Sequence, residues 1–95
     1  MNETVARRVL DDEIGLLQTQ SYGELRDQLL RSVVTKEVLG PDGATYQIEI
    51  QAYWDDRPDG DLNVTVSVDD GQGWRVFVPL TDGFVISPPG LSVNA

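Results

Sequence analysis

The spacing of hydrophobic residues changes about one third of the way along the chain, from a helical period to a strand period. In the first twenty residues, apolar side chains recur at helical spacing: Val5, Val9, Leu10, Ile14 and Leu17. This stripe predicts an N-terminal helix within residues 1–20, with Asn2 or Thr4 as its N-cap. The pattern leaves open whether this helix is only loosely attached to the rest of the domain.

A second helix is predicted within residues 21–34. Ser21 and Glu24 have the spacing of a capping box, in which each side chain bonds to the backbone N–H of the other residue. Leu25, Leu29 and Val33 then fall on one stripe, which we expect to face the core.

From residue 34 onward, apolar and polar residues alternate, as in strands with one buried face. Strands are predicted over residues 34–39, 46–54, 62–68, 74–80 and 84–86, with a further short strand considered at 91–93. Turns and loops rich in glycine, proline and aspartate separate them at 40–43, 55–61, 69–73 and 81–83.

The short connections favour an antiparallel meander. We therefore predict a single α+β domain over residues 1–95, with two N-terminal helices packed on one face of a four- or five-stranded antiparallel sheet. A small barrel with the helices outside is the alternative, and the strand order stays open. The predicted core is Leu25, Leu29, Val33, Ile48, Ile50, Trp54, Val64, Val66, Val68, Trp74, Val76, Val78 and Phe84.

Charge narrows the classes of partner. The chain carries 16 acidic and seven basic residues and a formal net charge of −9. Such acidity repels phosphate backbones and anionic lipid, so we expect no direct binding to nucleic acid and no membrane association. The start of the chain lacks a secretory signal and no segment is long and apolar enough to span a bilayer, so we expect a soluble protein. The acidity has two interpretations, simple solubility or a basic partner.

The sequence offers little for catalysis. Without cysteine or histidine, it lacks the commonest general base and the commonest metal ligands. The segment Asp55–Asp61 invites comparison with a calcium loop, but the third position is Arg57 and the twelfth is Val66, neither of which can serve as a ligand. We expect no catalytic residue, no cofactor and no metal, and we assign Glu49 a structural pairing with Arg75 across the sheet.

A binding surface is the positive expectation. Tyr53, Arg75 and Phe77, with Val85 nearby, belong to the strand positions that should face water, and aromatic residues and arginine are enriched at binding hot spots. The alternative is that Phe77 packs beneath the N-terminal helix or a loop. We predict a small protein-interaction module without catalysis, of unknown oligomeric state. The alternative is an acidic immunity or inhibitor protein that binds a basic enzyme surface.

Several segments together resemble a small bacterial domain family without an assigned activity. They are Gly40-Pro41-Asp42-Gly43, Tyr46-Gln47-Ile48-Glu49-Ile50, Trp54-Asp55-Asp56, Asp61-Leu62-Asn63-Val64, Ser67-Val68-Asp69-Asp70-Gly71 and Gly73-Trp74-Arg75. The resemblance covers about residues 21–90 and leaves the first helix outside. It implies a cytoplasmic bacterial protein and nothing about mechanism.

Overall fold

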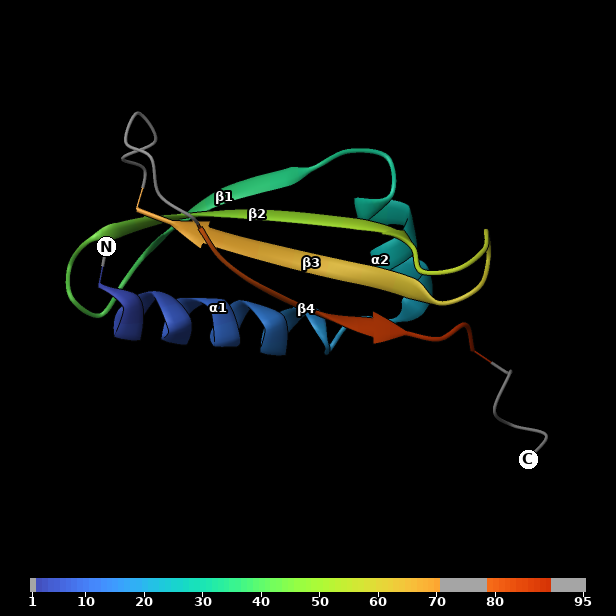
Figure 1. Ribbon diagram of the computed structural model, residues 1–95, viewed down its shortest axis with the longest axis horizontal. Coiled ribbons are helices and arrows are strands. Elements are labelled where there is room, and N and C mark those ends of the chain that lie inside the picture. Colours follow the sequence, from blue (N-terminus) through green and yellow to red (C-terminus); the bar gives the residue numbers. More distant parts are fainter. Residues whose placement is uncertain (1, 71–78, 90–95) are drawn as a thin grey trace.

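Two helices precede a four-stranded antiparallel sheet (Figure 1). The computed structural model describes residues 2–70 and 79–89. The elements in chain order are α1 (Glu3–Leu17), α2 (Tyr22–Leu29), β1 (Val34–Leu39), β2 (Thr45–Trp54), β3 (Leu62–Asp69) and β4 (Leu80–Ile86). The strands lie in the order β1-β2-β3-β4, so the sheet is an antiparallel meander; most of the strand predicted over 74–80 lies outside the described residues. The considered strand at 91–93 lies outside the described residues.

Both helices begin at the caps that the sequence provides. The Asn2 side chain accepts a hydrogen bond from the Val5 N–H at 3.1 Å. At α2, the Ser21 hydroxyl accepts from the Glu24 N–H at 3.1 Å, and the Glu24 carboxylate accepts from the Ser21 N–H at 2.9 Å. The predicted capping box is therefore present. It satisfies backbone donors that have no partner within the helix.

The second helix ends earlier than predicted. α2 stops at Leu29, so Val33 lies outside it and is 47% exposed instead of belonging to the core. The spacing of Leu29 and Val33 suits a helix, but Val33 precedes the β-branched residues Val34 and Thr35, which favour an extended backbone. β1 accordingly starts at Val34.

The core lies where side chains of both helices meet one face of the sheet. Ile48 and Ile50 of β2 are buried while Gln47 and Glu49 are exposed, so the predicted strand register is correct. In Figure 1, α1 runs along the sheet and α2 lies near one end of it. The buried apolar cluster comprises Ala6, Val9, Leu10, Leu17, Tyr22, Leu25, Leu29, Tyr46, Ile48, Ile50, Ala52, Leu62, Val64, Val66 and Val68.

Five of the other predicted core residues lie outside the buried cluster or outside the described residues. Trp54 and Phe84 are half-buried and pack against the cluster. Trp74, Val76 and Val78 lie outside the described residues. The cluster includes Ala6 and Leu10 of α1, which are fully buried, so this helix contributes to the core.

The segment Thr81-Asp82-Gly83 is part of a strand, not the predicted turn. β4 runs through it from Leu80 to Ile86, with Gly83 opposite Thr65 of β3. A Cβ atom at Gly83 would overlap the carbonyl oxygen of Val64. The glycine therefore permits a close approach of two strand backbones, a role that its sequence neighbourhood does not distinguish from a turn.

The β1–β2 hairpin closes through the predicted turn. The Gly43 N–H donates to the Gly40 carbonyl at 3.0 Å, and Gly43 has a φ of 82°, a conformation that favours glycine. The Tyr46 hydroxyl donates to Asp42 Oδ2 at 2.7 Å, and the Ala44 N–H donates to Asp42 Oδ1 at 3.1 Å. The hydrogen bond from Tyr46 lowers the pKa of Asp42, and the same bond raises the pKa of Tyr46 to about 12.

Two ion pairs join α1 to the two outermost of the described strands. Lys36 of β1 reaches the buried Glu13, with Nζ 2.7 Å from Oε1. Arg7 reaches Asp82 of β4, with Nη1 3.1 Å from Oδ2. Lys36 and Asp82 therefore occupy the helix side of the sheet, although both are charged.

Candidate binding face of the sheet

The candidate site is the face of the sheet that points away from α1, called the outer face below. Each strand contributes alternate residues to it, because successive side chains of a strand point to opposite sides. The strand register places these side chains in rows that cross the sheet. Three such rows are Tyr53–Asn63–Val85, Thr35–Glu49–Ser67–Thr81 and Glu37–Gln47–Asp69.

Apolar side chains mark one end of the outer face. Tyr53 is 48% exposed and Val85 is 51% exposed, and both lie opposite Asn63 on the strand between them. With strands about 4.8 Å apart, their Cα atoms are separated by roughly 10 Å. A single partner side chain or short segment can contact both.

Only part of the predicted patch can be placed. Tyr53 points outward and is accessible, as expected. Arg75 and Phe77 lie outside the described residues, so the patch of Tyr53, Arg75 and Phe77 stays a prediction, and so does the pairing of Glu49 with Arg75. Val85 takes the neighbouring position that its strand alternation indicates.

The middle of the outer face is polar and internally hydrogen-bonded. The Ser67 and Thr81 hydroxyls lie 3.0 Å apart across β3 and β4. The Thr65 hydroxyl donates to the Gln51 carbonyl at 3.4 Å. These contacts hold side chains of neighbouring strands in place.

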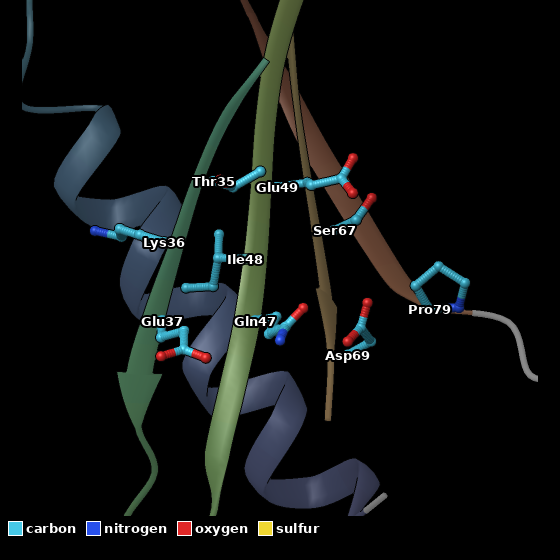
Figure 2. Close-up of a pocket in the computed structure, with 9 residues that line it drawn as sticks. All are labelled: Thr35, Lys36, Glu37, Gln47, Ile48, Glu49, Ser67, Asp69 and Pro79. Carbon is cyan, nitrogen blue, oxygen red and sulfur yellow. The ribbon is translucent and has the colours of Figure 1, made fainter. Parts of the chain in front are cut away.

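A hollow of about 400 Å³ lies at the other end of the outer face. Its lining includes two exposed carboxylates on adjacent strands, Glu37 of β1 and Glu49 of β2 (Figure 2). Glu37 lies opposite Gln47, two residues from Glu49, so the two glutamates are diagonal neighbours with Cα atoms roughly 7–8 Å apart. The remaining lining is Thr35, Lys36, Gln47, Ile48, Ser67, Asp69 and Pro79.

Among the described residues of the outer face, the charged side chains that line the hollow are acidic. Lys36 belongs to the lining, but its ammonium group is engaged with Glu13 of α1 on the other side of the sheet. Within residues 2–70 and 79–89, neither Glu37 nor Glu49 forms an ion pair, and the outer-face positions of the four strands hold no lysine or arginine. The alternation of residues along β1 indicates that Glu37 points to the outer face. Its position next to Glu49 follows only from the pairing register of β1 with β2.

The acidic loop between β2 and β3 is tied to the helical layer. The buried Tyr22 hydroxyl of α2 donates to the Gly60 carbonyl at 2.7 Å. The Asp55 N–H donates to the Asp61 carbonyl at 2.9 Å, and the Asp55 carboxylate accepts from the Asn63 side chain at 3.2 Å. The loop therefore has a defined shape, with its carboxylates on the surface.

The part of the chain that the structure describes contains no cluster of three or more carboxylates arranged to hold a metal ion. Neither described helix has the length and hydrophobicity needed for a membrane span.

No protein-family model, no curated protein and no solved structure matches the chain.

Proposed function

We propose that this protein is a small non-catalytic module that binds another protein through the outer face of its sheet. The observation that carries the proposal is the exposure of Tyr53 and Val85 in one row of that face, on either side of Asn63 and at positions held by paired strands. Burial of an exposed aromatic or branched side chain is favourable by about 1.5–3 kcal/mol. Because the strands are already ordered, binding there carries little entropic cost.

The test uses site-specific photocrosslinking in the source cells. A photoreactive amino acid is placed at position 53, and a matched control carries it at Leu16, an apolar residue of α1 that is 60% exposed. We expect a defined protein to crosslink to position 53 and not to position 16. Equal capture at both positions would argue against a specific outer-face site.

Affinity for the captured protein then gives the quantitative test. Tyr53→Ala should leave the free energy of unfolding within about 1 kcal/mol, since exposed substitutions usually do. It should weaken binding at least about tenfold if Tyr53 is a hot spot. Unchanged affinity would refute the proposed site.

The acidic β2–β3 loop supports a second candidate, an immunity or inhibitor protein that binds a basic enzyme surface. The hydrogen bond from Tyr22 to Gly60 holds this loop in place, so it could dock with little ordering. The discriminating variant neutralises Asp55, Asp56, Asp59 and Asp61 to asparagine. Loss of binding in this variant, with full binding by Tyr53→Ala, would favour the inhibitor over the outer-face module.

A further inference from the structure

We infer that the partner of the outer face is a protein segment that presents a basic side chain to the Glu37–Glu49 hollow and an apolar side chain to Tyr53. This inference rests on the proposed function and adds the chemistry of the partner. It commits the outer face to one kind of occupant, because the charged side chains on the described part of this face are acidic and would repel a nucleic acid or an anionic surface.

Charge complementarity gives the first step. Glu37 and Glu49 are exposed on neighbouring strands and make no ion pair with another described residue, while Lys36 is held on the opposite side by Glu13. In Figure 2, the Glu49 side chain extends toward Ser67, while the Glu37 carboxylate lies on the other side of β2. A lysine or arginine in the hollow is attracted by both charges and can donate a hydrogen bond to either carboxylate.

The apolar end of the face gives the second step. Tyr53 is four residues from Glu49 along β2, which corresponds to about 13 Å at the strand rise. A partner in an extended conformation spans that distance with about four residues. The outer face therefore fits a segment with a basic residue and an apolar residue about four positions apart.

The volume and lining of the hollow give the third step. Its volume of about 400 Å³ accommodates a long side chain and not a folded domain. Thr35, Gln47 and Ser67 line it with groups that can donate or accept hydrogen bonds. Such a polar pocket suits the head group of arginine or lysine, while the stem of that side chain lies along the strand.

The experiment uses a displayed library of random nine-residue peptides selected on the purified full chain. Selected peptides are then measured against wild type, Glu37→Gln/Glu49→Gln, Tyr53→Ala and a control, Asp11→Asn/Asp12→Asn, which removes the same charge from exposed positions of α1. Binding is measured at two salt concentrations.

We expect enrichment of peptides with a basic and an apolar residue about four positions apart. Their affinity should fall roughly fivefold in Glu37→Gln/Glu49→Gln, and less than twofold in the α1 control. Added salt should weaken binding to wild type more than to the double glutamine variant.

Three results would overturn the inference. Peptides that bind through Tyr53 without basic residues would leave the proposed function standing and remove the charged subsite. Basic peptides that lose equal affinity in the α1 control would show non-specific attraction to an acidic protein. A selection that yields no binding peptide would contradict both the inference and the proposed function.

Discussion

Substituting Lys36 with methionine should destabilise the fold more than substituting its partner Glu13 with glutamine. The reason is the unequal burial of the pair, because the Glu13 side chain is 6% exposed and the Lys36 side chain is 40% exposed. Lys36→Met leaves a carboxylate buried against the sheet without its counter-ion. Glu13→Gln leaves an ammonium group that can still reach water.

The magnitudes follow from these exposures. Removing one partner of a buried ion pair lowers the free energy of unfolding by about 3–5 kcal/mol. Because Lys36 is partly exposed, we expect a loss of about 3 kcal/mol for Lys36→Met. Glu13→Gln keeps a side-chain oxygen that can accept from Lys36, so we expect a loss of about 1 kcal/mol. The double variant Glu13→Leu/Lys36→Met should recover to within about 1 kcal/mol of wild type, because no unpaired charge remains.

Urea unfolding followed by tryptophan fluorescence measures all three values. The matched control is Arg7→Met, which breaks the pair of α1 with Asp82, where both side chains are about half exposed. That pair should contribute no more than about 1 kcal/mol. A larger loss for Glu13→Gln than for Lys36→Met, or a double variant weaker than either single one, would refute the reasoning.

Three further predictions concern strand approach, the hairpin turn and a helix cap. Gly83→Ala should lower stability by about 2–4 kcal/mol in thermal unfolding, since its Cβ would overlap the Val64 carbonyl; a loss below about 0.5 kcal/mol would contradict the close approach. The pKa of Asp42 is lower in the folded state than in the unfolded state. The ionised Asp42 carboxylate therefore contributes fully to folding stability above its unfolded pKa near 4, and this contribution is lost as the pH falls through the lower folded pKa. Asp42→Asn should therefore lower the free energy of unfolding at pH 7 and make it fall less steeply as the pH is lowered. Unfolding curves at several pH values measure both effects. The same hydrogen bond raises the pKa of Tyr46 to about 12. The contribution of the Tyr46 hydroxyl to folding stability is therefore complete below the unfolded pKa near 10 and is lost as the pH rises through about 12. An ultraviolet titration in which Tyr46 ionises at the ordinary tyrosine pKa would contradict this contact. Ser21→Ala removes the acceptor of the capping box and should cost about 1 kcal/mol by urea unfolding, while an unchanged midpoint would show that the cap is dispensable.

Local patterns were sufficient for most of the elements. The alternation around Ile48 and Ile50 predicts both the strand and its buried face, because only one of two registers buries the branched residues. The Ser21 and Glu24 spacing likewise predicts the start of α2. In these cases, the physical cause acts between residues that are close in sequence.

Misassigned positions depend on contacts that are distant in sequence. The Asp82-Gly83 pair has the composition of a turn, yet Gly83 is required by the Val64 backbone of the neighbouring strand. Val33 matches the helical stripe, but the chain is already extending toward β1 at that point. The spacing of apolar residues along the chain does not indicate either of these effects.

The candidate site was predictable only in part for the same reason. The outward position of Tyr53 follows from alternation along one strand. Placing Glu37 and Glu49 in one hollow requires the pairing register of β1 and β2, and the engagement of Lys36 away from the outer face is known only from its contact with Glu13. These relations arise from packing, which the order of residues along one strand does not specify.

The two ion pairs of α1 have a consequence for how the domain can be divided. Lys36 and Asp82 would sit among apolar side chains on a bare sheet if α1 were removed, on the two outermost described strands. Inward-pointing charges on outer strands discourage a second sheet from stacking or extending there. A fragment that begins after α1 would therefore lose its counter-ions along with its hydrophobic cover. Fusion partners are better attached before Asn2 than substituted for the first helix.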